Sequence, residues 1–408
     1  MTASTAATIV TDAEISAIRG VVEAALPRYL DELATLVNVD CGSYTRDGVN
    51  EIAAWTAACL SSLGAQVERR PDPNGRLGDT VVGTFHGSPG GPRALLIGHM
   101  DTVFDVGTAS VRPFRILEGR AYGPGVTDMK SGLLAGLHAL AALRAAAQDP
   151  EWIPFSRLVF IANPDEEIGS PSSTPHVRAA ALESDVAFVL ECARANGDIV
   201  SARKGTVDLR LTVHGRAAHA GVEPEKGRNA ILAAAHQVIA LQALNGRWPD
   251  LTCNVGVIGG GTRPNVVADS ATLEVDLRSP SRVDLEAAEA QLRAIASAEV
   301  VPDVTTTIEE MGRHWPMETS PGGARLVELA VALAGRLGFD LHDAATGGAS
   351  DANTTAGLGV PTLDGLGPIG GNDHAPGEYL EVDSIVPRLT LLALLLLTVG
   401  REGVSRRG

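Results

Sequence analysis

The sequence predicts an α/β protein in which helices cover both faces of a mixed sheet, with a smaller α+β unit inserted into the larger one. Short, wholly apolar segments alternate with segments of helical apolar spacing in the first half of the chain. After about residue 200 the pattern changes to strict polar–apolar alternation, which is typical of strands with one exposed face. At 408 residues the chain is also longer than one ordinary domain.

The larger unit is expected to contain helices and buried strands in alternation. Helical spacing predicts helices, and short apolar runs predict buried parallel strands. The expected helices are 12–38, 50–63 and 131–147, and the expected strands are 94–98, 157–162 and 186–190. The apolar stretch 389–399 predicts a buried helix that also belongs to this larger unit.

The inserted unit is expected to span 203–311, which leaves 1–202 and 312–408 for the larger one. Its predicted order is β-α-β-β-α-β, the ferredoxin-like arrangement. The expected strands are 206–213, 252–258, 271–278 and 304–309, and the expected helices are 229–244 and 285–298.

Charge and cysteine usage exclude several functions. The net charge of −16 argues against nucleic acid and anionic membranes as partners. The run 389–399 is shorter than the ~20 residues that cross a bilayer, and residues 1–20 lack the features of a signal peptide, so we expect a cytoplasmic protein. The four cysteines are scattered without a CxxC pair, so any metal must be held by histidines and carboxylates.

Polar residues follow each of the three buried strands. His99 follows 94–98, with Asp101 placed on the same side to accept its second ring N–H. Glu166 and Glu167 follow 157–162, and Glu191 follows 186–190. Ligands of open α/β sheets bind beyond the carboxyl ends of strands, so these side chains are expected to gather there.

Each of these residues has a simpler interpretation when it is taken alone. Asp128 precedes a helix and could be its N-cap, and His374 could be an ordinary loop histidine. The three consecutive acids 165–167 could form a surface turn, although a cation would relieve their repulsion. The coincidence at three strand ends favours a metal site instead. Two histidines and several carboxylates suit Zn²⁺, and also Co²⁺ or Mn²⁺.

The motifs at these positions resemble those of the M20 family of metallopeptidases, and among them those of its glutamate carboxypeptidase branch. The matching segments are Gly98-His99-Met100-Asp101-Thr102-Val103, Gly123-Pro124-Gly125-Val126-Thr127-Asp128-Met129-Lys130 and Asp165-Glu166-Glu167-Ile168-Gly169-Ser170. The resemblance implies a zinc-peptidase-like catalytic domain with two Zn²⁺ ions, for which Co²⁺ or Mn²⁺ could substitute. It implies that Asp128 bridges the ions, with a cis peptide bond after it.

The resemblance also implies a role for each remaining residue of this group. Glu166 would be the general base, and Asp101 would support His99. The remaining ligands implied by the family are His99, Glu191, Glu167 and His374.

In the inserted unit, the segment Gly215–Gly221 resembles the family's lid motif. It implies that His219 stabilises the oxyanion in the active site of a second subunit, and hence a homodimer formed through this unit. Asn265, Arg278 and Arg313 match substrate-binding positions. The lysine that glutamate-selective members place after the last acidic ligand is absent here, where the chain reads Gly197-Asp198-Ile199-Val200.

The expected activity is metal-dependent hydrolysis of an amide bond beside a free carboxylate. The substrate would be a short peptide, as for a carboxypeptidase, or an N-acylated amino acid, as for an aminoacylase. A non-catalytic binding protein of the same fold is the remaining alternative.

Overall fold

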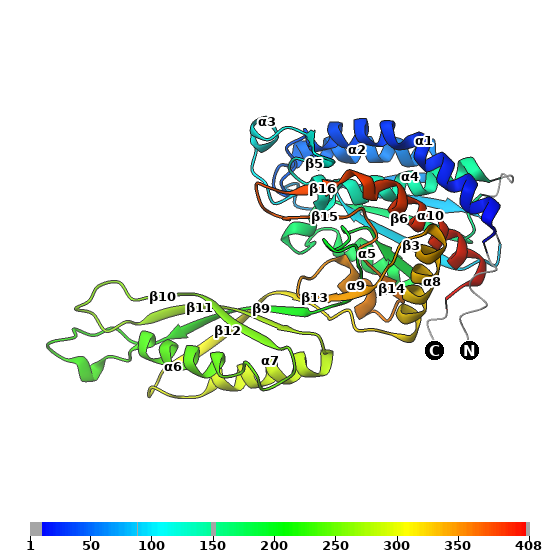
Figure 1. The fold of residues 1–408 in the computed structure, drawn as a ribbon. Helices are drawn as coiled ribbons and strands as arrows, with labels where there is room; N and C mark the ends of the chain where they lie inside the picture. The colour runs from blue at the N-terminus through cyan, green and yellow to red at the C-terminus, as the bar shows by residue number, and fades with distance from the viewer. Residues whose placement is uncertain (1–9, 88, 148–151, 405–408) are drawn as a thin grey trace. The chain divides into compact units, whose positions relative to one another are not determined.

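The computed structural model describes residues 10–87, 89–147 and 152–404. Its elements fall into two compact units, which we describe separately (Figure 1). The first contains the described residues up to Ser201, Thr319–Ala345 and the chain from Ser350 onward. The second contains Ala202–Glu318 and Thr346–Ala349. It extends beyond the expected end at 311, because its last strand continues to His314.

The first unit is built on a six-stranded mixed sheet of order β1-β2-β6-β3-β7-β14. Strands β6, β3, β7 and β14 are parallel to one another, whereas β2 is antiparallel to both of its neighbours, β1 and β6. The predicted mixed sheet is confirmed. The bounds are β1 Gln66–Arg70, β2 Thr80–His86, β3 Arg93–His99, β6 Arg157–Asn163, β7 Val186–Val189 and β14 Thr362–Leu363.

Helices surround this sheet (Figure 1). They are α1 Asp12–Val37, α2 Arg46–Ser62, α3 Thr108–Val111, α4 Ser131–Ala146, α5 Thr174–Leu182, α8 Pro321–Leu337, α9 Asp351–Gly357 and α10 Ile385–Glu402. A second sheet in this unit joins β4 Arg115–Leu117, β5 Arg120–Tyr122, β15 Gly370–Gly371 and β16 Tyr379–Glu381. A two-stranded sheet pairs β8 Ile199–Arg203 with β13 Asp343–Thr346.

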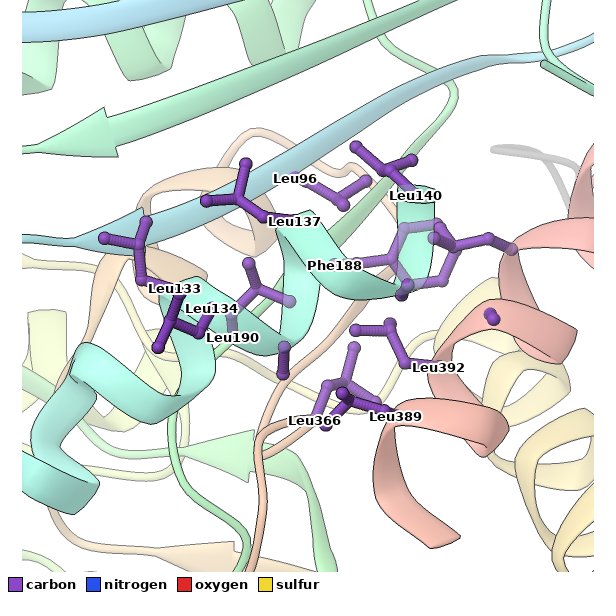
Figure 2. Packing of buried hydrophobic residues seen from close by; sticks show 14 of the residues in the cluster. Leu96, Leu133, Leu134, Leu137, Leu140, Phe188, Leu190, Leu366, Leu389 and Leu392 are labelled. Atoms are coloured by element: carbon purple, nitrogen blue, oxygen red, sulfur yellow. The ribbon is translucent and has the colours of Figure 1, made fainter. Parts of the chain in front are cut away.

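The core of the first unit packs around α4, in which nearly every residue from Ser131 to Leu143 is buried. Its leucines, including Leu133 and Leu137, belong to one buried cluster with Phe188, Leu389 and Leu392 (Figure 2). Each fully buried leucine or phenylalanine contributes about 1.5–3 kcal/mol to folding. This packing fixes the start of α4, and therefore the loop before it that carries Asp128.

The C-terminal helix requires a correction. The helical stretch Val382–Glu402 has 21 residues and is long and apolar enough to cross a membrane. It is longer than the run 389–399, so the length argument made from sequence fails. However, 78% of its apolar window is buried inside the protein, as in the core helix of a globular protein.

The second unit has the predicted β-α-β-β-α-β order. Its sheet has the order β10-β11-β9-β12, and all three pairings are antiparallel. The side chains of Asn229 and Ser281 cap its two helices by accepting backbone N–H bonds. The elements are β9 Gly205–His214, α6 Ala230–Gln242, β10 Thr252–Gly260, β11 Ser270–Ser279, α7 Arg282–Ser297 and β12 Thr305–His314.

Candidate metal centre

His99 is the last residue of β3 and its side chain is almost fully buried. Its Nδ1 lies 3.0 Å from the backbone carbonyl oxygen of Asp101 and 3.4 Å from the Asp101 carboxylate. These acceptors orient the ring so that Nε2 faces Asp128, 3.0 Å from its Oδ1. The expected support of His99 by Asp101 therefore comes mainly from the Asp101 carbonyl.

The carboxylate of Asp101 has a second role, which the sequence did not reveal. It accepts hydrogen bonds from the Ser43 hydroxyl and from the backbone N–H groups of Glu166 and Glu167. Asp101 thus ties the loop that follows β6 to the loop that follows β3. This connection sets where the two glutamates point.

Asp128 does not cap α4. Its backbone is non-helical (φ −113°, ψ 95°), the peptide bond to Met129 is cis, and the N-cap position of α4 is Lys130. One carboxylate oxygen of Asp128 lies 3.0 Å from Nε2 of His99, and the other lies 3.1 Å from Nε2 of His374. Burial alone would raise the pKa of Asp128, but the hydrogen bonds from His374 and His99 lower it well below its usual range.

The acidic residues after β6 lie on a 3₁₀ turn, Glu166–Ile168, and they are only partly exposed. Oε2 of Glu167 lies 3.0 Å from Nε2 of His374, whereas its Oε1 is buried without a hydrogen-bond partner. Burial raises the pKa of Glu166 well above its usual range, the charge of His99 opposes this, and Glu191 adds to it. The surface-turn interpretation is therefore wrong for this segment.

His374 reaches the same place from the other end of the sequence. Its backbone has a positive φ of 62°, a conformation that residues other than glycine seldom adopt and that often accompanies a functional constraint. Glu191 follows β7, and its Oε1 lies 3.8 Å from Nε2 of His99. The structure thus brings together the seven residues that the sequence pointed to in this unit, namely His99, Asp101, Asp128, Glu166, Glu167, Glu191 and His374.

The donor set fits divalent cations. Ligand atoms of His99, Asp128 and Glu167 lie within 4.8 Å of one another, and so do those of His99, Glu166 and Glu191. Several carboxylates this close are stable only if a proton or a cation neutralises part of their charge. The buried Oε1 of Glu167 has no hydrogen-bond partner in the described part of the chain, so its lone pairs could coordinate a metal ion. Imidazole and carboxylate ligands together are suited to Zn²⁺ and related ions.

Glu378 is a site residue that sequence reasoning missed. Its carboxylate is 1% exposed and accepts backbone N–H bonds from Gly125, Thr127 and Asp128 at 2.9, 2.9 and 3.1 Å. Burial raises the pKa of Glu378 to about 7, although these hydrogen bonds oppose the shift. Its position four residues after His374 was the available signal. Glu378 holds the bend that carries Asp128.

We therefore expect Glu378→Gln to loosen the metal centre. The new amide would direct N–H donors at backbone N–H donors, which costs about 1–3 kcal/mol of stability. Loss of such supporting contacts typically lowers metal affinity by about 10–100-fold. Zinc titration against a competing chelator, with thermal unfolding of the metal-free protein, measures both effects. Glu381→Gln is the matched control, because the Glu381 carboxylate pairs only with exposed Arg120 among the contacts of the described chain. Equal zinc affinity in the two variants would contradict the role of Glu378.

A second unforeseen group lies beneath the Glu166–Ile168 turn. The carboxylate of Asp351, at the start of α9, accepts hydrogen bonds from the Asn163 amide and the Ser170 hydroxyl. The Ser173 hydroxyl bonds to Asn163 and to Asp165. Burial raises the pKa of Asp351 to about 6. This buried network holds both ends of the turn that presents Glu166 and Glu167.

The other expected site residues lie in the second unit. His219 and Asn265 are neighbours there, since the N–H of Ala220 donates to the Asn265 carbonyl. Nδ1 of His219 accepts the N–H of Gly221 at 3.1 Å, so in the neutral ring Nε2 carries the proton. Arg278 forms a two-pronged ion pair with Asp276.

Arg313, the third expected substrate-binding residue, is paired within the second unit. Its guanidinium pairs with both Glu289 and Glu310 and lies beside the ring of Trp315. Both carboxylates are on neighbouring elements of the second unit, α7 and β12. A substrate carboxylate would have to compete with them for Arg313, as it would with Asp276 for Arg278.

Comparison with known proteins places these features in a family. The sequence profile of peptidase family M20/M25/M40 matches residues 95–398, a span that contains every residue of the candidate centre. The chain belongs to this family. It is 30% identical over 378 residues to carboxypeptidase G2 of Pseudomonas sp. (strain RS-16), covering 92% of this chain and 90% of that protein. This M20 chain is also 29% identical to acetylornithine deacetylase of Edwardsiella ictaluri (strain 93-146), covering 85% and 88%.

Solved structures agree on the fold of the M20 protein. The crystal structure of aminopeptidase PepT from Bacillus cereus ATCC 10987 matches with a TM-score of 0.73 at 24% identity, covering 92% of this chain and 98% of that one. A metallo-carboxypeptidase of the M20 family from Sulfolobus solfataricus matches with a TM-score of 0.69 at 16% identity, covering 91% and 99%. The protein is therefore a metal-dependent peptidase or amidohydrolase of this family, and the resemblance found in its motifs is confirmed.

Proposed function

We propose that the protein hydrolyses an amide bond beside a free carboxylate, using two Zn²⁺ ions. The observation that carries this proposal is the Asp128 carboxylate, whose two oxygens face two different histidines, His99 and His374. A carboxylate in that position is suited to bridge two cations. Glu191 would complete the shell on the His99 side, and Glu167 the shell on the His374 side.

When bound, a pair of zinc ions lowers the pKa of water from about 16 toward 7 and polarises a substrate carbonyl. The protein supplies the proton transfers. The Glu166 carboxylate takes the proton from the attacking water as the new C–O bond forms. It then gives this proton to the amide nitrogen as the C–N bond breaks, so that acid and amine leave and Glu166 is ionised again.

His219 is proposed as the oxyanion donor, supplied by the partner subunit of a homodimer. The hydrogen bond from Gly221 to Nδ1 places the proton of the neutral ring on Nε2, which makes Nε2 a donor. Asn265, its neighbour, and Arg278 are proposed to hold the free carboxylate of the substrate. The Arg278 guanidinium would then bind the substrate carboxylate and the Asp276 carboxylate at the same time.

Exposed features of the second unit support dimerisation. Strand β10 lies at the edge of its sheet, and its Val257 and Ile258 are 53% and 57% exposed. Helix α6 packs beside β10 and leaves Ile239 71% exposed. An exposed strand edge next to an apolar patch is a pairing surface for a second copy of the chain.

Two substrate classes fit the same chemistry. Carboxypeptidase G2 among the relatives favours cleavage of a C-terminal residue, and acetylornithine deacetylase favours removal of an N-acyl group. A panel of dipeptides and N-acyl amino acids, assayed on zinc-loaded protein, separates them. We expect turnover of at least one series, loss of activity after chelation, and recovery on adding zinc or cobalt. Undiminished hydrolysis by protein whose metal content is below detection would contradict the proposal.

A further inference from the structure

A cavity of about 450 Å³ opens beside the candidate metal centre in the first unit. One wall is the segment 42–45 between α1 and α2, and the other is 102–106, which directly follows the β3 loop. Glu167 and Ile168 line it as well. The cavity therefore touches the centre through a residue proposed to ligate metal. Its volume lies in the range of small-molecule sites.

The two walls are held in place by backbone contacts. The N–H of Thr102 donates to the Cys41 carbonyl at 3.0 Å, and the N–H of Ser43 donates to the Thr102 carbonyl at 3.2 Å. At Gly42 a Cβ atom would come within 2.4 Å of the Phe104 carbonyl oxygen, so only glycine permits this approach. The Asp40 carboxylate accepts two further backbone N–H bonds, from Gly107 and Ala109, just beyond the second wall. These contacts fix the two walls of the cavity without the help of a ligand.

Apolar side chains line this cavity although they are open to solvent. Tyr44, Val103 and Val106 are 67%, 41% and 72% exposed. Their exposure leaves apolar area unburied unless a ligand covers it. Gathering such residues beside a polar centre is typical of a binding site.

The charges of the cavity select its ligand further. Among the described residues that line it, Asp105 and Glu167 are acidic and none is basic. The guanidinium of Arg112 lies 4.5 Å over the ring of Phe104 and donates to the Ala375 carbonyl. A carboxylate seated in the cavity would meet two like charges. A carboxylate is therefore disfavoured in this cavity.

We infer that this cavity binds the acyl side of the scissile amide and that it selects a large apolar or aromatic acyl group. The inference rests on the proposed function. The side chain of the released amino acid is one carbon from its carboxylate, so placing that side chain in the cavity would bring the carboxylate toward Asp105 and Glu167. The acyl group carries no such charge. An acetyl group would leave Tyr44 and Val106 uncovered, whereas a benzoyl group would cover them.

The test compares N-benzoyl and N-acetyl forms of the same amino acids, including alanine and glutamate, on zinc-loaded protein. We expect kcat/KM to be at least about ten-fold higher for the benzoyl form, as for added apolar area in a hydrophobic pocket. Val106→Asp should reduce this ratio to near one. The control is Val111→Asp, an identical replacement at a valine that is 80% exposed, five positions away and outside the cavity. It should leave the ratio unchanged.

Calorimetric binding of both compounds to the Glu166→Gln protein gives a readout that does not depend on turnover. If the benzoyl form binds more tightly and adding Val106→Asp abolishes this difference, the cavity assignment is supported. This holds even if the wild-type protein hydrolyses neither compound; absence of hydrolysis would reject only the proposed reaction. Hydrolysis of both forms at equal rates would keep the reaction and reject the cavity assignment. Equal losses for both forms in Val106→Asp, or the same change in Val111→Asp, would also overturn it.

Discussion

Glu166→Gln is expected to lower kcat by about 10³-fold or more while the protein keeps its metal. Glutamine has nearly the same size as glutamate but cannot accept the proton of the attacking water at neutral pH. The backbone N–H of residue 166 still bonds to Asp101, so the turn that carries Glu167 keeps its anchor. Steady-state kinetics and elemental analysis of the purified variant measure the two quantities.

The same experiment separates a base from a ligand. One carboxylate oxygen of Glu166 lies within 4.8 Å of possible ligand atoms of His99 and Glu191, so a direct metal contact is the competing assignment. Loss of one ion per subunit in Glu166→Gln would favour that assignment over the proton-transfer role. Glu23→Gln is the matched control, since Glu23 pairs with Arg19 on the exposed surface of α1. Its kinetics should equal those of wild type.

His219→Ala is expected to lower kcat by about 10²–10³-fold without loss of metal, which is the usual effect of deleting one oxyanion donor. Its matched control is His214→Ala, because His214 is an exposed histidine of the same unit whose Nε2 contacts Thr307. We expect His214→Ala to retain normal turnover. A small effect of His219→Ala on kcat with a large effect on KM would assign His219 to substrate binding instead.

Mixed dimers show whether His219 acts between subunits. A hybrid of one Glu166→Gln chain and one His219→Ala chain has one fully intact site if the histidine serves the partner's centre. Its activity should then approach half that of wild type. If each histidine serves its own chain, both sites of the hybrid carry a defect and no activity returns. Differently tagged chains, purified in two steps, provide the hybrid.

Local patterns in the sequence predicted the parts of the site that follow strands. His99, Glu166, Glu167 and Glu191 each come after a short apolar run, and the ends of neighbouring parallel strands meet at one edge of a sheet. Asp128 could not be settled in this way. A helix cap and a bridging ligand have the same local sequence, and only the positions of His99 and His374 in the fold distinguish them.

Long-range contacts account for what the sequence did not predict. Glu378 bonds to backbone groups about 250 residues earlier, and Asp351 bonds to Asn163, 188 residues earlier. No periodicity encodes such pairs, and the spacing of Glu378 from His374 indicated only that Glu378 lies near the centre. The pairing of Arg313 with Glu289 could not be predicted either, because it joins a residue of β12 to a residue of α7. The end of the second unit has a different explanation. Strand β12 continues to His314, through residues in which polar and apolar side chains alternate only weakly.

The order in which the chain supplies its ligands has a consequence for biosynthesis. Four of the proposed ligands are in place once residue 191 has left the ribosome, but His374 and the Glu378 brace arrive nearly two hundred residues later. Until then the acidic side chains have no second imidazole beside them and the Asp128 bend has no brace. A nascent or truncated chain that ends before Glu378 should therefore hold zinc weakly, so that tight loading of the ions, and with it hydrolysis, waits until this segment has been made.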